Sequence, residues 1–359
     1  MQRGRRVAGV GESQGLGEAL FAAVDDGELT IDAAQRVLVL GARDADAWRH
    51  RAGTAWCCEQ TFKPWAQALA RAGLRVEESV DEGDFDAVIV FAPRSRERTR
   101  ALHARAAQRV REGGIVVAVQ ANDQGARSAQ ADLQALIGPL RQASRRKCRV
   151  FWRVVERASV DAALLAEWSA LDAMQPILDG RYWSRPGLFA WDRVDAASAL
   201  LADHLPATLA GRVADLGAAY GYLATEVLRR CRAVDAIDLY EAEALAREPA
   251  LRNLQAATAA RGDTVAAQFF WHDVTQGLPR RYDAIVSNPP FHEGRADLPE
   301  LGRAFIAAAA DALQTQGELW LVANRHLPYE ATLARRFGEV RNVAEHGGFK
   351  IIAATRVRP

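Results

Sequence analysis

The sequence predicts an α/β protein with two tandem domains, each built on a mostly parallel sheet that carries helices on both faces. Its 359 residues are enough for two domains of ordinary size. Short apolar runs alternate with helical stretches rich in Ala and Arg, which is typical of βα units around a parallel sheet. The same series of apolar runs occurs twice, so we expect a Rossmann-like fold in duplicate.

Three landmarks recur in the same order in both halves, and each is a short apolar run that we expect to be a strand. The pairs are 36–42 (RVLVLGA) with 212–218 (RVADLGA), 85–90 (FDAVIV) with 282–287 (YDAIVS), and 114–119 (GIVVAV) with 317–322 (GELWLV). Any two α/β domains share some pattern of this kind. The common order and similar spacing favour a true duplication.

The domain boundary is expected within 173–187, which is rich in Pro, Gly and aromatic residues and has no long periodicity. We place the first domain at 1–178 and the second at 179–359. The second domain ends with two β-rich runs, at 339–343 and 349–354, around a Gly-Gly turn. This ending predicts a seven-stranded sheet whose last strand is antiparallel.

Positive and negative side chains nearly balance, with 46 Lys and Arg against 45 Asp and Glu, so nucleic-acid binding would depend on local patches. The four cysteines form no CxxC pair, and we interpret them as reduced thiols without a metal site. No apolar stretch is long enough to span a membrane, and the charged N-terminus lacks the apolar region of a signal peptide. These features predict a cytoplasmic protein with no metal and no membrane partner.

A cofactor loop is predicted where the apolar run 213–216 enters a turn that contains Gly217 and Gly221, with a helix expected at 222–230. Such a turn brings backbone N–H groups at a helix N-terminus close to a ligand. Asp215 precedes the glycines, and its carboxylate would repel phosphate but suit the amino group of a bound amino acid. The loop therefore predicts S-adenosylmethionine as the cofactor, and a simple helix-capping turn is the alternative.

Two further acidic positions fit the same cofactor. A carboxylate at the end of the second strand commonly accepts both ribose hydroxyls of an adenosine, and Glu241 is the first candidate, with Asp238 as the second. Asp273 follows the third strand and is placed to accept a hydrogen bond from the adenine amino group. A lone Asp after a strand is also a common turn or cap residue.

The strongest local motif is Ser-Asn-Pro-Pro-Phe-His at 287–292, where a strand stops at two prolines. The side-chain oxygen of Asn288 and the carbonyl of Pro289 can each accept one hydrogen of an exocyclic amino group. This would aim the nitrogen lone pair at the sulfonium methyl group, so that catalysis is mainly positioning. Phe291 offers a face on which an extruded base can stack. His292 is a loop or substrate contact, with late proton acceptance as the alternative.

The first copy lacks these chemical groups. Val39 stands where the second copy has Asp215, and Phe-Ala-Pro at 91–93 stands where it has Asn-Pro-Pro at 288–290. The apolar strands remain in both copies. We therefore expect the first domain to keep the fold without the chemistry.

With these motifs the chain resembles the bacterial ribosomal RNA guanine-2-amino methyltransferases typified by the small-subunit methyltransferase C family. The resemblance covers nearly the whole chain and rests on 122–129, 146–151, 186–189, the Asp215 loop, 287–292, 322–329 and 348–350. It implies two tandem class I methyltransferase domains, of which only the second binds cofactor and the first helps to hold RNA. It also implies a guanine of small-subunit ribosomal RNA, or of large-subunit RNA in a sister group, as the substrate.

One position departs from the family pattern. The family usually has Gly-Cys-Gly-x-Gly in the cofactor loop, whereas this chain has Gly-Ala-Ala-Tyr-Gly at 217–221. Ala219 adds a methyl group where the backbone comes close to the cofactor, so we expect weaker binding or a shifted loop.

Candidate RNA contacts are Arg145, Arg146 and Lys147, in a basic run without acids, and Lys350 beside the active face. A second arginine-rich run lies at 94–111. Solvated helix faces are the alternative for both runs.

Two other functions stay open from the sequence. One is methylation of an adenine amino group or a protein glutamine, for which the motif often carries Tyr in place of Phe291. The other is an RNA-binding assembly factor without catalysis, suggested by Ala219 and Tyr220. Binding of S-adenosylmethionine would separate the second from the enzymes.

Overall fold

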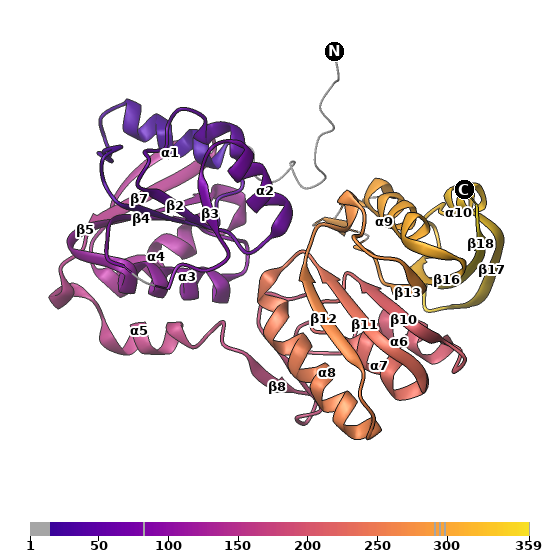
Figure 1. Cartoon of the computed structure of the whole chain (residues 1–359). Helices are drawn as coiled ribbons and strands as arrows, with labels where there is room; N and C mark the ends of the chain where they lie inside the picture. Colours follow the sequence, from indigo (N-terminus) through magenta and orange to yellow (C-terminus); the bar gives the residue numbers. More distant parts are fainter. Residues whose placement is uncertain (1–14, 82, 291, 294–295, 298, 359) are drawn as a thin grey trace, which may run out of the picture. The chain divides into compact units, whose positions relative to one another are not determined.

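The computed structural model describes residues 15–81, 83–290, 292–293, 296–297 and 299–358. The chain forms two compact units, Met1–Ala173 and Met174–Pro359. Figure 1 shows that each unit has its own sheet with helices on both sides.

In the first unit the described strands form one sheet of seven, in the order β3-β2-β1-β4-β5-β7-β6. The first five strands in this order pair in parallel, and β7 pairs antiparallel with both β5 and β6. The bounds are β1 Val37–Leu40, β2 Trp56–Glu59, β3 Arg75–Glu77, β4 Phe85–Phe91, β5 Val110–Ala121, β6 Arg141–Arg145 and β7 Cys148–Val154.

The first sheet has a core on each face because its strands are apolar on both sides. One face packs against α1 and α2, and the other against α3, α4 and α5. The helices are α1 Leu16–Asp25, α2 Lys63–Arg71, α3 Arg96–Arg109, α4 Ala126–Ile137 and α5 Ala162–Ser169.

The second unit repeats the arrangement in the order β12-β11-β10-β13-β16-β18-β17. Its bounds are β10 Ala210–Leu216, β11 Ala233–Glu241, β12 Ala266–Trp271, β13 Tyr282–Ser287, β16 Leu313–Asn324, β17 Phe337–His346 and β18 Phe349–Val357. The first five strands in this order are parallel, whereas β18 is antiparallel to β16 and β17.

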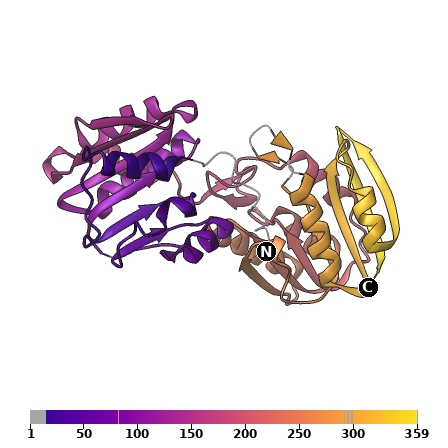
Figure 2. The ribbon, with the colours of Figure 1, turned by 90° about the horizontal axis from the view of Figure 1, so that it is seen from above.

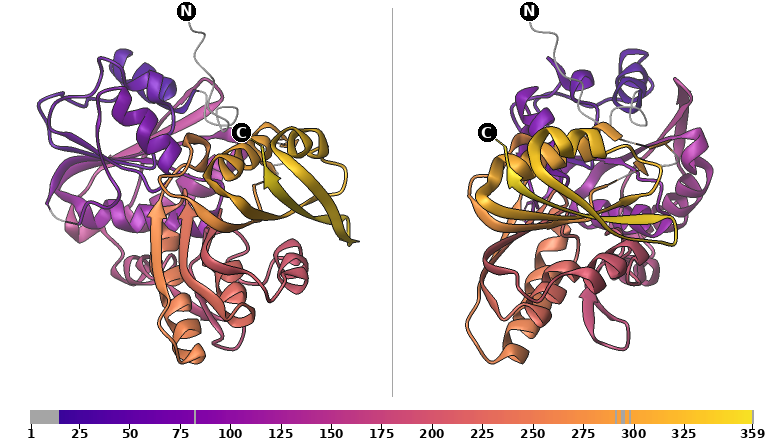
Figure 3. Two further views of the ribbon diagram at one scale, coloured as in Figure 1. Left: turned by 45° about the vertical axis from the view of Figure 1, so that its right-hand side comes forward. Right: turned by 90° about the vertical axis from the view of Figure 1, so that its right-hand side faces the viewer.

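Helices cover both faces of the second sheet (Figure 3). One core holds side chains of α6, α7 and α8, and the core on the opposite face holds side chains of α9 and α10. The helices are α6 Ala196–His204, α7 Tyr222–Arg230, α8 Arg247–Arg261, α9 Pro299–Ala312 and α10 Glu330–Arg336.

The two sheets confirm the predicted duplication, because the strands follow one another in the same spatial order in both units. The three sequence landmarks fall on equivalent strands, β1 and β10, β4 and β13, and β5 and β16. A polar contact recurs as well. The Asp86 carboxylate accepts a hydrogen bond from the Arg36 backbone N–H at 2.8 Å, and the Asp283 carboxylate accepts one from the Arg212 N–H at 2.8 Å.

The segment in which we expected the domain boundary contains a small antiparallel hairpin of β8 (Gln175–Ile177) and β9 (Tyr182–Ser184). The hairpin belongs to the second unit. Its Ile177 and Tyr182 side chains pack with Tyr220 of the predicted cofactor loop. The hairpin therefore forms part of the wall behind that loop.

The predicted closing hairpin is confirmed by β17 and β18, drawn in yellow at the edge of the second sheet in Figure 2. Lys350 lies on β18 and is only 4% exposed. Its ammonium donates to the Leu327 carbonyl oxygen at 2.8 Å and to the Glu330 carboxylate. The predicted RNA contact does not fit this placement, because a buried ammonium with two protein acceptors cannot reach a phosphate without breaking its contact to α10.

Candidate active site

The two most distinctive residues of the sequence lie at adjacent strand ends. Strands β10 and β13 pair in parallel, with Asp215 beside Val286 and Leu216 beside Ser287. The Ser287 hydroxyl donates to the Leu216 carbonyl oxygen at 2.8 Å and ties the two ends together. Asn288 follows directly, so its side chain leaves the sheet at the same edge as that of Asp215, where open α/β sheets bind ligands.

Asp215 is fully buried, with an exposure of 0%. Its Oδ2 atom accepts a hydrogen bond from the Ala224 N–H at 3.0 Å, whereas Oδ1 has no partner among the described residues. Burial, and secondarily the negative charge of Glu241, raises the pKa of Asp215 to about 7. An unpaired buried carboxylate oxygen is costly, and a cationic ligand group would satisfy it.

The loop between β10 and α7 has the left-handed geometry that the glycines predicted. Gly217 and Gly221 have φ of 77° and 84°, and Gly221 directly precedes α7. The Gly217 N–H donates to the Tyr240 carbonyl oxygen at 2.9 Å. Ala219 also has a positive φ, 46°, which is unfavourable for a residue with a Cβ atom. The loop thus has three residues with positive φ, and one of them carries a Cβ atom.

Glu241 ends β11 and holds the same loop. Its Oε2 atom accepts from the Ala219 N–H at 2.8 Å, and its Oε1 atom accepts from the Glu243 N–H at 2.8 Å. Burial raises the pKa of Glu241, against the lowering that these backbone donors cause. The carboxylate keeps acceptor capacity for a ribose hydroxyl beside its backbone donors, which include the Ala242 N–H.

Asp238, the second candidate for the ribose contact, lies elsewhere. Its Oδ2 atom accepts from the guanidinium groups of Arg212 and Arg280, at 3.2 and 3.0 Å, and from the Tyr282 hydroxyl at 2.9 Å. These partners belong to the starts of β10 and β13, at the opposite end of the parallel strands from Asn288. Asp238 and the arginines line a separate hollow of about 560 Å³.

Asp273 is 7% exposed and caps a short 3₁₀ helix, Val274–Gln276. Its Oδ1 atom accepts from the Thr275 N–H at 3.0 Å and from the Thr275 hydroxyl at 2.7 Å. The cap role that the sequence left open is therefore present. The predicted adenine contact is compatible with it, because Oδ2 has only a 3.4 Å contact with the Gln276 amide.

The Asn288 amide is anchored by two residues that sequence reasoning did not single out. Its Nδ2 atom donates to Asp195 Oδ2 at 2.9 Å and to the Ser198 hydroxyl at 2.8 Å. Asp195 is the N-cap of α6, where the same Oδ2 atom accepts from the Ser198 N–H at 2.9 Å. An Asp before an apolar helical run predicts a cap, but it gives no sign of a partner so distant in the chain.

These residues share one small pocket, of about 30 Å³. Its lining residues are Phe189, Ala190, Asp195, Ser198, Asp215, Gly217, Ala218, Ala219, Tyr220, Tyr222, Leu223 and Asn288. Phe189, one of these lining residues, is 60% exposed. Phe291 and the side chain of His292 lie outside the described residues.

Three features in and around the pocket match groups of S-adenosylmethionine. The unpaired Oδ1 atom of Asp215 is available to an ammonium group. The turn at Gly217 carries no side chain beside Asn288, whose carbonyl oxygen would lie 3.7 Å from an added Cβ. Glu241 ends the neighbouring strand and is bonded to the same loop.

In the first unit, other residues stand at the positions that Glu241 and Asp215 occupy in the second unit. The strand registers place Gln60 at the position equivalent to Glu241, one residue after β2. Gln60 Nε2 donates to the Ala42 carbonyl oxygen at 2.6 Å, and Oε1 accepts from the Phe62 N–H at 2.8 Å. A neutral amide thus bonds the first loop, while Val39 fills the place of Asp215. No sequence motif pointed to Gln60, because an isolated Gln carries no pattern.

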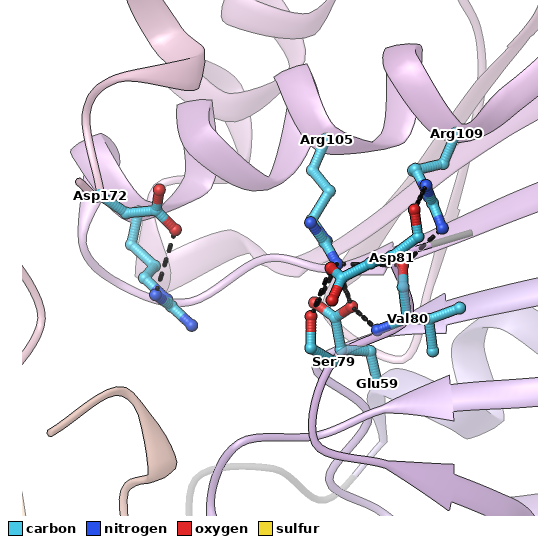
Figure 4. A network of polar contacts seen from close by, with 8 residues as sticks. Glu59, Ser79, Val80, Asp81, Arg105, Arg109 and Asp172 are labelled. Carbon is cyan, nitrogen blue, oxygen red and sulfur yellow. Dashed lines mark hydrogen bonds and ion pairs between the residues drawn. The ribbon is translucent and has the colours of Figure 1, made fainter. Parts of the chain in front are cut away.

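The arginine-rich run at 94–111 is mostly engaged within its own unit. Figure 4 shows Arg105 and Arg109 on α3 turned toward Glu59 and the segment 79–81. Arg96 and Arg100 both pair with the buried Asp132, and these contacts lower the pKa of Asp132 to about 2 against the opposing effect of its burial. Further pairs are Arg98 with Asp172 and Arg111 with Asp86. This run therefore stabilises the fold, and Arg94 is the exposed member for which the described residues offer no bonded partner.

The second basic run lies on the β6–β7 turn. Acids that are distant in the sequence come close to it: Arg145 pairs with Asp26 and Glu28, and Arg146 pairs with Glu18. Lys147 is exposed at the tip of the turn, and no described residue pairs with it. The net positive charge of this turn is thus smaller than its sequence suggested.

Within the described ranges, no group of three or more His, Cys, Asp and Glu side chains could hold a metal ion. In that same part of the chain, no helix has both the length and the apolar character needed to cross a membrane.

Comparisons with known proteins agree with this geometry. Residues 33–170 match the model of the methyltransferase small domain N-terminal family, and residues 179–353 match that of the methyltransferase small domain. The ribosomal RNA small subunit methyltransferase C of Pseudomonas paraeruginosa is 35% identical over 284 residues, which cover 79% of this chain and 82% of the relative. The protein of the same name from Stutzerimonas stutzeri is 32% identical over 326 residues, covering 89% and 95%.

A solved structure has the same two-domain fold. The T. thermophilus 16S rRNA N2 methyltransferase RsmC, in complex with AdoMet and guanosine, matches with a TM-score of 0.75 and 24% identity, covering 97% of this chain and 93% of that one. The sequence likeness to the bacterial relatives extends over both domains. The chain is therefore a methyltransferase and belongs to the ribosomal RNA small subunit methyltransferase C family.

Proposed function

We propose that the protein transfers a methyl group from S-adenosylmethionine to the exocyclic 2-amino group of a guanine in 16S ribosomal RNA. The observation that carries this proposal is the presence of Asn288 and Asp215 in one pocket, on adjacent strand ends. The names of the relatives support the RNA, and the T. thermophilus complex with AdoMet and guanosine supports the cofactor and the base.

In this proposal four groups hold the cofactor. The free Oδ1 atom of Asp215 accepts from the methionine ammonium, and the backbone from Gly217 to Gly221 lies along the same moiety. Glu241 accepts from the ribose hydroxyls and Asp273 from the adenine amino group. When bound, S-adenosylmethionine supplies an electrophilic methyl group on a positively charged sulfur.

The substrate amino group is held by two oxygen acceptors. The Oδ1 atom of Asn288 and the carbonyl oxygen of Pro289 each accept one of its hydrogens, which leaves the lone pair directed at the methyl group. Positive charge grows on the nitrogen during transfer, and both acceptors stabilise that charge. The N–C bond forms as the S–C bond to the methyl group breaks, and the nitrogen then releases its surplus proton to water. Phe291 stacks on the base and keeps its plane fixed.

The first domain has a supporting role in this proposal. Its Val39 and Gln60 leave no carboxylate for a cofactor, and the turn carrying Arg145, Arg146 and Lys147 contributes contacts to RNA phosphates. Lys147 is the strongest of the three candidates, because the other two are partly neutralised by acids. The substrate places this activity in the cytoplasm.

The test is methyl transfer from labelled S-adenosylmethionine to small ribosomal subunits that lack the modification, with the product nucleoside identified by mass. We expect 2-methylguanosine, and we expect Asn288→Ala to lower kcat by about 100-fold or more with cofactor Kd within about 2-fold of wild type. Label in an adenine or in protein would contradict the proposed substrate. Loss of cofactor binding in Asn288→Ala would contradict its proposed role.

A further inference from the structure

We propose that Asp195 is a positioning residue for the methyl transfer, because its carboxylate fixes which end of the Asn288 amide faces the substrate. The inference rests on the function proposed above. It starts from one contact, the 2.9 Å hydrogen bond from Asn288 Nδ2 to Asp195 Oδ2. The two residues are 93 positions apart, and α6 carries Asp195 to the end of β13.

The two ends of an Asn side-chain amide have nearly the same shape, so packing alone distinguishes them poorly. An ionised carboxylate accepts hydrogen bonds and donates none. The amide must therefore turn Nδ2 toward Asp195, since the reverse orientation would bring two oxygen atoms together. Ser198 does not decide the orientation, because its hydroxyl can either accept or donate.

Asp195 is itself held in place at the N-terminus of α6. Its Oδ2 atom also accepts from the Ser198 N–H at 2.9 Å. The acceptor that orients Asn288 is therefore anchored to the backbone of α6.

The orientation determines what the pocket offers to a substrate. With both Nδ2 hydrogens bonded to Asp195 and Ser198, the Oδ1 atom has no protein partner among the described residues. It is then available as an acceptor for an amino group. In the opposite orientation the Asn288 amide would present N–H groups to the substrate N–H groups, and nothing would hold the lone pair in line.

The experiment compares Asp195→Ala and Asp195→Asn with wild type, using small subunits that lack the modification and labelled S-adenosylmethionine. Removal of the carboxylate should lower kcat by about 10- to 100-fold while cofactor Kd stays within about 2-fold. Asp195→Asn can still cap α6, but its own amide N–H can pair with Asn288 Oδ1. We therefore expect an intermediate kcat for it.

Asp161→Ala is the matched control, because Asp161 caps α5 in the first unit in the same way, accepting from the Leu164 N–H at 2.9 Å. It should lower the melting temperature about as much as Asp195→Ala, yet leave kcat unchanged. Ser198→Ala should reduce kcat only a few-fold, since Asp195 still sets the orientation.

Three outcomes would count against the inference. Equal turnover of wild type and Asp195→Ala would overturn it. Parallel loss of kcat and cofactor binding, with a larger fall in melting temperature than Asp161→Ala, would mean that Asp195 only supports the fold. An inactive wild type that binds cofactor would overturn the proposed function, and this inference with it.

Discussion

Gln60 occupies in the first domain the position that Glu241 occupies in the second. Gln60 directly follows β2, and Glu241 is the last residue of β11. Each side chain bonds to the loop after the first strand of its sheet and accepts from the backbone N–H two residues later. The contacts to the loop run in opposite directions: the amide donates to a carbonyl oxygen, whereas the carboxylate accepts from an N–H. The fold therefore needs a polar bridge here, and only the second domain combines it with a charge.

Cofactor affinity should depend on pH through Asp215, whose pKa is raised to about 7 mainly by burial. The carboxylate must be ionised to bind the methionine ammonium, so affinity should fall as pH decreases through 7. Between pH 8 and pH 6 we expect about a tenfold loss. Calorimetric titration of wild type and Asp215→Asn over this range measures the effect.

Asp215→Asn can still accept from the Ala224 N–H, so it tests the charge rather than the fold. The Asp215→Asn variant should bind the cofactor weakly. Its affinity should not fall between pH 8 and pH 6, apart from any effect of titration of the ligand itself. A wild-type curve parallel to that of the variant would refute the assigned role.

Replacing Ala219 with Gly should improve cofactor binding several-fold. The Ala219 methyl group lines the pocket, and its φ of 46° costs about 1 kcal/mol for a residue with a Cβ atom. Gly removes this backbone cost, but its greater freedom in the unfolded chain offsets part of the gain in folding stability. The free energy of unfolding should therefore change by less than about 0.5 kcal/mol.

Ala309→Gly on α9 is the control, because Ala309 is buried, has no positive φ and does not line the pocket. It should lose about 1 kcal/mol of stability and gain no affinity. Melting curves and cofactor Kd of both variants decide the matter. Equal affinities of Ala219→Gly and wild type would show that the methyl group does not hinder the cofactor.

RNA affinity should depend more on Lys147 than on Arg145. Lys147 is exposed on the β6–β7 turn without a described acidic partner, whereas Arg145 is paired with Asp26 and Glu28. Lys147→Ala should weaken binding and reduce the slope of log K against log salt by about 0.7 to 0.9, the value for one phosphate contact. Filter binding of small-subunit RNA at several salt concentrations measures both, and a larger effect of Arg145→Ala would reverse the assignment.

The first domain should lose stability in mild acid because of His103. This side chain is fully buried on α3, neither ring nitrogen has a partner among the described residues, and burial lowers its pKa to about 4. The unfolded chain takes up this proton near pH 6.5, so stability is complete above that pH. It falls by about 2 kcal/mol from pH 7.5 to pH 5.

Hydrogen exchange of the α3 amides in the intact chain reports this loss. His103→Leu removes the titrating group and buries no unpaired nitrogen. Between pH 7.5 and pH 5, the protection of its α3 amides should therefore fall by about 2 kcal/mol less than in wild type. If wild type and His103→Leu lose protection equally, other groups account for the acid sensitivity.

The fold was predictable because its signals are local. Each of the three recurring apolar runs becomes a strand of the parallel part of its sheet, and the loop after β10 and the Asn-Pro-Pro motif after β13 meet because those strands are neighbours. Contacts between distant segments carry no such signal. Asp195 approaches Asn288 only after α6 packs on the sheet. The basic run meets its acidic partners only after α1 packs on the sheet, and these partners are Glu18, Asp26 and Glu28. The burial of Lys350 likewise depends on α10 covering β18.

The repeated carboxylate–backbone bond at Asp86 and Asp283 lies at the starts of the fourth strands, the opposite end of each sheet from the pocket. Both copies keep this end alike, while Val39 and Asp215 differ at the other. The starts of the strands thus have the same structural contact in both domains, whereas the residues at the carboxyl ends of the strands differ. Grafting experiments on the first domain can therefore change residues at the carboxyl ends of its strands, provided that the contact between Arg36 and Asp86 is kept.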